Sequence, residues 1–272
     1  MWEGDLVKII KYKKIRNKYK VYLDDNSTLD LYEKVILDND LLLKKDIDSK
    51  LLEKIKEENN KEDIYEKSLN YINIKMRSTN ELKRYLTKNK FNSVDIEKVI
   101  ERLKDNRLLN DELYIRAFIS DKFNLTNDGP NKIKYNLLNE KLDKSLVQKY
   151  ISEIDLDEIK EKLEKLIDKK IKTIKNCSGY ILKQKVSSYF INLGYSKEMI
   201  DEILESKEFN NDNIGIKEYT RLYNKYSKKY SGYELDNVLR QKLYTKGFNY
   251  DEIKKNIDWY SFIVYQLIVQ RF

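Results

Sequence analysis

The chain has 272 residues, of which 54 are Lys or Arg and 46 are Asp or Glu, and its formal net charge is +8. Seven glycines and one proline are too few turn-forming residues for a β-sandwich or barrel, and 37% charged residues favour long solvated helices. The absence of histidine removes the commonest metal ligand and the usual general base of an enzyme.

The first 60 residues differ from the rest in their periodicity. Segments 8–12, 18–23 and 28–32 have alternating β-forming residues and predict a small antiparallel hairpin or three-stranded sheet. The N-terminus has no apolar signal-peptide core. A helix is expected over 48–60, and Asn59, Asn60 and Lys61 predict a domain boundary. We therefore assign 1–60 to an N-terminal domain of β-hairpin plus helix.

One pattern then occurs four times. In residues 81–103, Leu82 and Leu86 form an apolar i, i+4 stripe, a polar corner follows, and a second stripe begins beyond it. The same frame returns with Leu137, Phe190 and Leu243 in the place of Leu86, at nearly constant spacing. We expect these four residues to be buried at equivalent positions. The corner pairs are Asn89-Lys90, Glu140-Lys141, Leu193-Gly194 and Lys246-Gly247.

A longer helix is expected before each frame, at about 62–76, 112–125, 156–174 and 216–230, so each unit has three helices. A single unit is too small to bury its own apolar face, and stacking the units completes the core. The predicted fold is mainly α, with tandem three-helix repeats in an elongated curved array and a small N-terminal β-rich (α+β) domain. The predicted repeats are 61–110, 111–156, 157–210 and 211–272.

Local signals refine the expected helices. Tyr65, Leu69, Ile72 and Met76 are predicted to form the buried face of the first helix. Ser78 or Thr79 is expected to cap the next helix with help from Glu81 in a capping box, and Ser93 and Asp95 are candidate caps of the one after. Pro130 is expected in the first turn of a helix. The stripe Tyr219, Leu222, Tyr223, Tyr226 and Tyr230 is interpreted as core rather than as a base-stacking platform.

Two features bear on the cellular compartment. The single Cys177 excludes an intrachain disulfide framework and is typical of a reducing cytoplasm. The apolar C-terminal segment 259–272 is too short to span a bilayer. We expect it to cap the last repeat rather than to form a dimer contact. A cytoplasmic monomer without membrane contact or cofactor is predicted.

Several short motifs stand out in the first repeat and the start of the second. They are Leu69-Asn70-Tyr71-Ile72, Met76-Arg77-Ser78, Glu81-Leu82, Leu86, Val99-Ile100-Glu101-Arg102-Leu103, Asn110-Asp111-Glu112-Leu113-Tyr114, Ala117 and Gly129-Pro130. Together they resemble the RecX family of bacterial regulatory proteins, which modulate the recombinase RecA. The resemblance implies a protein that binds along the groove of the RecA–DNA filament and restrains ATP hydrolysis and strand exchange, with a role in homologous recombination, DNA repair and the SOS response. The fourth repeat exceeds the family's common three.

The corners depart from the family in two units. The glycine that the family often has there is kept as Gly194 and Gly247, which we expect at positive φ. Lys90 and Lys141 replace it in the first two repeats. A lysine in the left-handed region costs roughly 1 kcal/mol relative to glycine, so these two corners are expected to be built differently.

The candidate partner-binding residues are basic. The frame position after the buried Leu82 is occupied by Lys83, Lys134, Ser187 and Arg240 in the four repeats. Such a row at the rim of a groove suits the RecA filament or its DNA, since a net positive charge favours polyanionic or acidic partners. Lysine-rich composition from an AT-biased genome would give similar residues without function. The further candidates are Arg77, Arg84, Lys88, Lys132, Lys141, Lys185 and Lys242.

Two other functions compete with the filament regulator. A stand-alone DNA-binding protein is the alternative, because three-helix units with basic helices also enter a major groove. An enzyme such as a nuclease is less consistent with the sequence. Asp24-Asp25 and Asp111-Glu112 supply carboxylates, but there is no phosphate-binding glycine loop and no nucleophile–base pair. Asp24-Asp25 is typical of a turn and Asp111 of a helix cap.

Overall fold

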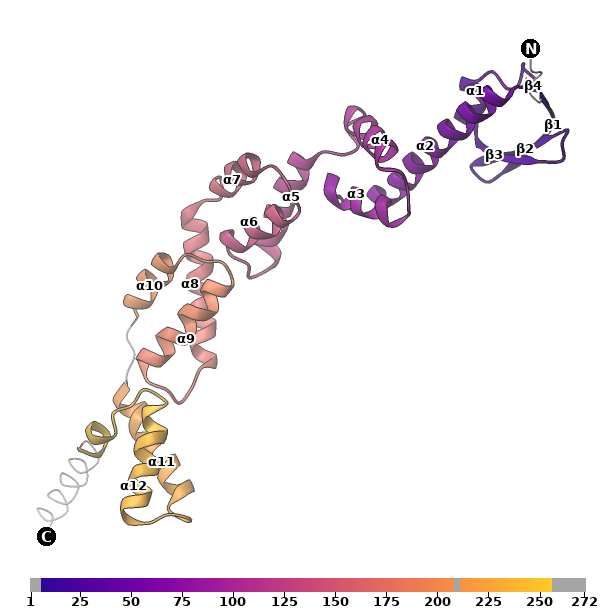
Figure 1. Cartoon of the computed structure of the whole chain (residues 1–272). Coiled ribbons are helices and arrows are strands. Elements are labelled where there is room, and N and C mark those ends of the chain that lie inside the picture. Colours follow the sequence, from indigo (N-terminus) through magenta and orange to yellow (C-terminus); the bar gives the residue numbers. More distant parts are fainter. Residues whose placement is uncertain (1–5, 208–210, 256–272) are drawn as a thin grey trace, which may run out of the picture. The chain divides into compact units, whose positions relative to one another are not determined.

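The computed structural model describes residues 6–207 and 211–255. The chain begins with an antiparallel sheet in the order β3-β2-β1-β4 (Figure 1). The predicted three-stranded sheet is confirmed, and a two-residue strand extends it. The strands are β1 (Val7–Ile15), β2 (Lys18–Leu23), β3 (Thr28–Tyr32) and β4 (Asp46–Ile47).

One face of this sheet forms a small core. Val21 pairs with Tyr12 on β1 and with Leu29 on β3, so the three side chains lie on one face. Val21 and Ile47 are fully buried. The short helix α1 (Glu33–Asp38) and the first half of α2 complete this core.

The helix α2 (Ser49–Ile74) is continuous, whereas the sequence predicted two helices separated at 59–61. The boundary prediction is wrong because Asn59 bonds to the sheet instead of breaking the helix. Its side chain accepts from the Tyr32 amide and donates to the Asp30 carbonyl, both at 2.9 Å. The helix contributes Ile55 to the N-terminal core and Ile64 to the core of the first repeat.

The first repeat consists of the end of α2, α3 (Thr79–Lys88) and α4 (Ser93–Asp105). Ser78 caps α3 in a capping box with Glu81, as predicted. The cap of α4 is Asn92, whose side chain accepts a hydrogen bond from the Val94 amide. The prediction of Ser93 or Asp95 as this cap is therefore wrong. Met76 lies beyond the end of α2 and is 52% exposed, so its predicted burial is also wrong.

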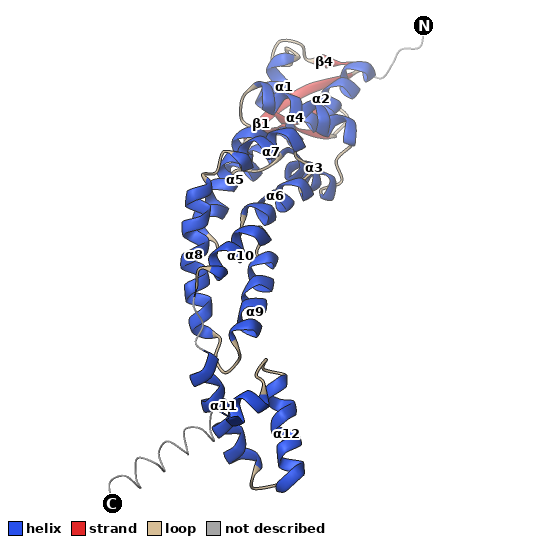
Figure 2. Ribbon diagram, turned by 90° about the vertical axis from the view of Figure 1, so that its left-hand side faces the viewer, coloured by secondary structure: helices blue, strands red, loops and turns tan. Residues whose placement is uncertain are grey.

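The other repeats follow the same plan of a longer helix followed by two shorter ones (Figure 2). Leu86, Leu137, Phe190 and Leu243 are each at most 1% exposed, which confirms the frame. Residues 250–255 are helical, while Ile257 and the segment 259–272 lie outside the described residues. The helices are α5 (Asp111–Leu125), α6 (Pro130–Asn139), α7 (Lys144–Ser152), α8 (Leu156–Thr173), α9 (Gly179–Asn192), α10 (Lys197–Glu205), α11 (Asn211–Tyr226) and α12 (Gly232–Tyr244).

All four corners place one residue in the left-handed region of φ. Gly194 and Gly247 have φ of 89° and 77°, as predicted, and Lys90 and Lys141 have φ of 65° and 56°. The expectation that the lysine corners are built differently is therefore wrong. The first corner closes with Phe91 N–H on the Leu86 carbonyl and Lys90 N–H on the Thr87 carbonyl, the Schellman pattern, and the third and fourth corners repeat it.

The tyrosine stripe of the fourth repeat is only partly core. Leu222 is buried, and Tyr219 and Tyr226 pack against the same cluster. Tyr223 and Tyr230 are exposed. Within the described ranges, no helix combines the length and apolar character needed to cross a bilayer.

The chain divides into two compact units. One comprises the residues up to Ala117 together with Asn139–Asp143, and the other comprises Phe118–Leu138 and the residues from Lys144 on. The corner of the second repeat therefore belongs with the first repeat. The contacts described below lie within one unit or the other.

Candidate partner-binding surface

The middle helix of each repeat positions most of the candidate basic residues. In α3, burial of Leu82 and Leu86 fixes which side of the helix faces the core. The position after Leu82 then lies at the edge of that buried stripe. Lys83 is accordingly half-buried and Arg84 is exposed.

The recurrent frame position contacts the third helix of its own repeat. Lys83 Nζ lies 2.5 Å from a Glu97 carboxylate oxygen on α4. Lys134 donates to the Gln148 side chain on α7. In the fourth repeat Arg240 donates two hydrogen bonds to Asp251, at 2.6 and 2.8 Å.

In the third repeat, the frame position is occupied by Ser187, and it also faces the third helix. Ser187 and Asp201 line the same surface hollow, with the serine on α9 and the aspartate on α10. The frame position thus faces helix three whether or not it is basic. In the first and fourth repeats, its charge is partly neutralised by Glu97 and Asp251, whereas in the second repeat Lys134 bonds to the neutral amide of Gln148.

Arg77 has a different environment from the other candidates. Its guanidinium stacks over the Tyr71 ring at 4.1 Å, and Tyr71 in turn stacks on Tyr85 with ring centroids 4.1 Å apart. Glu81 lies 3.6 Å away, and the arginine side chain is only 14% exposed. This placement holds Arg77 as a packing element of the turn before α3.

Arg84 connects the first repeat to the corner of the second. Its guanidinium donates to Glu140 at 2.6 Å. Tyr114 is buried nearby, and burial, with the negative charges of Glu81 and Glu140, raises its pKa to about 12. Arg84 therefore contributes to the junction between repeats.

Four candidate lysines are exposed and form no ion pair with any described residue: Lys88, Lys141, Lys185 and Lys242. Lys88 and Lys242 lie in the last turns of α3 and α12, and Lys141 lies just beyond the end of α6. Lys132 differs because it pairs with Asp128 at 2.7 Å. The C-terminal ends of three middle helices thus each carry a cation available to a partner.

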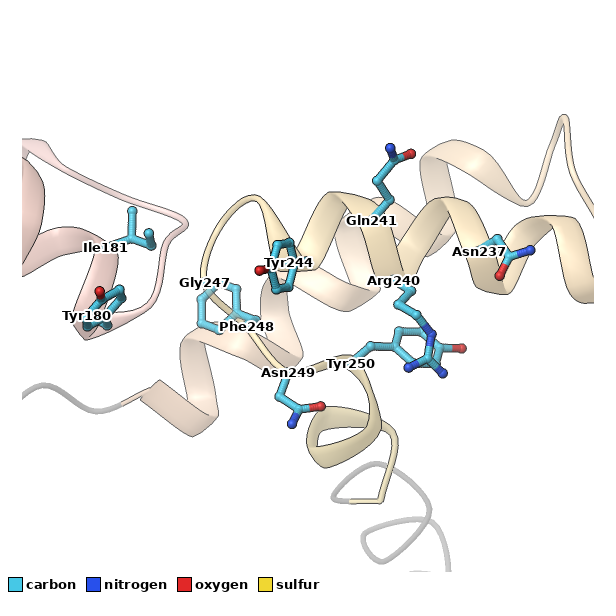
Figure 3. Close-up of a pocket in the computed structure, with 10 residues that line it drawn as sticks. All are labelled: Tyr180, Ile181, Asn237, Arg240, Gln241, Tyr244, Gly247, Phe248, Asn249 and Tyr250. Atoms are coloured by element: carbon cyan, nitrogen blue, oxygen red, sulfur yellow. The ribbon is translucent and has the colours of Figure 1, made fainter.

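A hollow of about 810 Å³ lies between the third and fourth repeats (Figure 3). Tyr180 and Ile181 from α9 face residues of α12 and the corner that follows it. Tyr250 lines the hollow, and burial together with its hydrogen bond to Asp236 raises its pKa to about 12. This hollow was not predicted, although Ser178-Gly179-Tyr180 at the start of α9 recurs as Ser231-Gly232-Tyr233 at the start of α12.

The side chains of the hollow and of the basic surface can be compared with the groups that enzymes use. The hollow is lined by aromatic, amide and arginine side chains without a nucleophile–base pair. No group of three or more Cys, Asp or Glu side chains able to hold a metal ion is found in the part of the chain that the structure describes. Asp111 accepts a hydrogen bond from the Thr79 amide at 2.7 Å, and Asn110 caps α5.

Comparisons with known proteins agree with one another. The family model for the first three-helix domain of RecX matches residues 65–103. "Regulatory protein RecX" of Lactococcus lactis subsp. lactis is 31% identical over 266 residues, covering 94% of this chain and 98% of the relative. That of Oceanobacillus iheyensis is 24% identical over 263 residues, covering 93% and 97%.

Solved structures show the same fold. The crystal structure of a regulatory protein RecX matches with a TM-score of 0.64 and 21% identity, covering 74% of this chain and all of the other. RecX from Lactobacillus salivarius matches with a TM-score of 0.51 and 23% identity, covering 54% and 95%.

Proposed function

The chain belongs to the RecX family of regulatory proteins, and on this basis we propose that it binds the RecA–DNA filament and restrains RecA's ATP hydrolysis and strand exchange. In this proposal it acts by binding, without catalysis of its own. Its role is then in recombination and DNA repair.

The observation that carries the proposed contact is the set of unpaired cations at the ends of middle helices. Lys88, Lys141 and Lys242 are exposed and have no ion-pair partner in the described ranges. Lysines at helix C-termini also interact with the helix dipole, at about 0.3–1 kcal/mol each. That interaction leaves the ammonium group exposed, so it does not compete with an acidic partner.

The basic residues at the recurrent frame position supply a second contribution to partner binding. Lys83 and Arg240 are 38% and 53% exposed in their ion pairs. Exposed pairs of this kind contribute roughly 0–1 kcal/mol, so exchanging the internal carboxylate for one of a partner costs little. Arg77 and Arg84 are better explained by packing and by the repeat junction.

The test is the ATPase rate of the cognate RecA on single-stranded DNA as the full chain is titrated in. We expect the rate to fall to a plateau, with the protein recovered on the filament in a co-sedimentation assay. An unchanged rate with no co-sedimentation contradicts the proposal. Affinity that is the same for bare DNA and for the filament would instead favour the stand-alone DNA-binding protein.

A further inference from the structure

The most strongly basic segment of the chain lies in its N-terminal sheet. Residues 8–20 contain seven Lys and Arg in 13 positions and no Asp or Glu, against 54 Lys and Arg in all 272 residues. Local enrichment of this kind exceeds what a lysine-rich composition provides. The segment forms most of β1, the hairpin tip and the start of β2 (Figure 1). The seven residues are Lys8, Lys11, Lys13, Lys14, Arg16, Lys18 and Lys20.

The strand register places three of these cations, Lys11, Lys13 and Lys20, on the solvent face of the sheet. Lys11 lies opposite Tyr22, and Lys13 lies opposite Lys20. Because side chains alternate along a strand, these residues point away from the core that Tyr12 and Val21 face. Lys11 and Lys13 are exposed.

Most of these charges have no carboxylate partner. Lys18 pairs with Asp63 at 2.9 Å, and Lys8 lies 3.9 Å from Asp46. Asp30 lies opposite Lys20 in the register, yet the two form no ion pair. Among the described residues, no ion pair is formed by Lys11, Lys13, Lys14, Arg16 or Lys20.

Folding does not explain this arrangement. Like charges directly opposite each other in a sheet are destabilising, and Lys13 and Lys20 are such a pair. Alternate residues of a strand are roughly 6.6–6.8 Å apart, so cations at alternate positions form a row with regular spacing. A regular polyanion matches this grid of cations better than the scattered carboxylates of a protein surface.

We propose that the solvent face and tip of the β1–β2 hairpin bind the phosphate backbone of DNA directly, through Lys11, Lys13, Arg16 and Lys20. The contact is electrostatic and carries no base-sequence preference. It goes beyond the proposed function, because it requires DNA alone and no RecA.

The test measures binding of the full chain to bare fluorescein-labelled oligonucleotides, single-stranded and duplex, by fluorescence anisotropy across roughly 50–300 mM salt. The hairpin variant is K11Q/K13Q/R16N/K20Q. Asn is chosen at position 16 because Arg16 has a φ of 56°, which asparagine tolerates. The matched control, K98Q/K104Q/K169Q/K172Q, removes the same charge from exposed positions on α4 and α8.

We expect wild type and the control to bind at least one of the two probes with the same salt dependence. The hairpin variant should bind more weakly, with a log–log salt slope shallower by roughly 0.7–0.9 for each lost phosphate contact. An unchanged thermal transition shows that it is folded. Should it not fold, Lys11→Gln and Arg16→Asn alone should each remove about one such step.

Three results would overturn the proposal. The first is that the wild-type protein binds neither DNA probe. This result overturns the proposal even if the protein binds polyglutamate, a polyanion without phosphate. The second is a control variant that loses as much affinity as the hairpin variant. The third is a folded hairpin variant with the wild-type slope. None of these readouts involves RecA, so failure here is distinct from failure in the ATPase assay.

Discussion

Gly129 and Gly194 pack backbone against backbone at the junction of the second and third repeats. The Gly129 amide donates to the Leu193 carbonyl at 2.6 Å, and the Asn131 amide donates to the Gly194 carbonyl at 3.0 Å. The N-terminus of α6 thus satisfies carbonyls at the C-terminus of α9, where the helix dipoles also complement each other. The next junction repeats this contact, with Ser178 N–H on the Lys246 carbonyl at 2.9 Å.

Alanine substitutions at three glycines distinguish two effects at such a junction: the strain of a positive φ and the lack of space for a Cβ atom. At Gly129 an added Cβ would lie 2.6 Å from the Gly194 carbonyl carbon, while the backbone there is ordinary. Gly232 has a φ of 54° with open space around it. Gly194 combines a φ of 89° with a Cβ position 2.3 Å from the Lys132 nitrogen.

We expect Gly194→Ala to be the most destabilising of the three, by about 2–5 kcal/mol, because left-handed strain and overpacking both apply. Gly232→Ala should cost about 1–2 kcal/mol, from strain alone. Urea unfolding of the three variants measures these differences. A Gly194→Ala cost no greater than that of Gly232→Ala would show that the junction relaxes around the new methyl group.

At the first corner, we expect substitution of Lys90 by glycine to increase stability, whereas the glycine-to-alanine changes decrease it. Lys90 has a φ of 65° and is exposed, so Lys90→Gly removes the strain without losing a packed side chain. Relief of about 1–2 kcal/mol is partly offset by about 0.4–1 kcal/mol from the more flexible unfolded chain. We expect a net stabilisation of up to about 1.6 kcal/mol, measured by urea unfolding. A destabilised variant would mean that the Lys90 side chain makes a favourable contact.

The repeat frame was predictable because local spacing alone defines it. Leu82 and Leu86 read as one face of a helix without reference to any other element. The continuity of α2 was not predictable, because Asn59 is explained only by its bonds to Tyr32 and Asp30 on β3. An asparagine pair that breaks a helix and one that bonds to a sheet look the same in sequence.

For the candidate surface, too, some features were predictable from the sequence and others were not. The recurrence of a basic residue at the position of Lys83 and Arg240 was visible in the sequence. Its ion pairs with Glu97 and Asp251 were not, because they depend on how the third helix packs against the second. The burial of Arg77 likewise depends on the stacked pair Tyr71 and Tyr85.

Glu218 provides a pH-dependent contribution to the stability of the fourth repeat. Its side chain is 1% exposed and pairs with Arg221 at 2.7 Å and with Lys246 at 2.8 Å. Burial opposes its ionisation, but the hydrogen bonds from Arg221 and Lys246 outweigh burial and lower its pKa. A carboxylate with a lowered folded pKa stabilises the protein above its unfolded pKa, which is about 4.3 for Glu.

This stabilisation should be lost as pH falls through the lowered pKa of Glu218. We therefore expect Glu218→Gln to be less stable than wild type at neutral pH, and the difference to narrow below about pH 4.3. Urea unfolding of both proteins between neutral and acidic pH measures it. The exposed Glu161→Gln serves as the control, since among the described residues Glu161 forms an ion pair only with Lys165 on the surface. A Glu218→Gln difference that is independent of pH would argue against the ion pairs as its source.

The proposed filament contact is tested most directly by comparing unpaired with paired cations. Lys88→Gln, Lys141→Gln and Lys242→Gln together remove three charges that have no ion-pair partner in the described part of the chain. Surface substitutions of this kind usually change stability by less than about 0.5 kcal/mol each, so lost binding is separable from unfolding. Lys83→Gln, Lys134→Gln and Arg240→Gln form the comparison set, the paired set, because these cations already bond within the chain. Lys83 and Arg240 pair with the carboxylates of Glu97 and Asp251, and Lys134 donates to the neutral amide of Gln148.

We expect the variant with the unpaired set changed to need a roughly tenfold or higher protein concentration for the same restraint of the RecA ATPase. The salt dependence of that restraint should also become weaker. The paired set should have the smaller effect, because its cations must first exchange their internal partners. The reverse order would place the contact on the frame position that faces helix three. Wild-type restraint by both folded variants would show that these lysines and arginines are solvated surface residues and that the filament contacts the protein elsewhere.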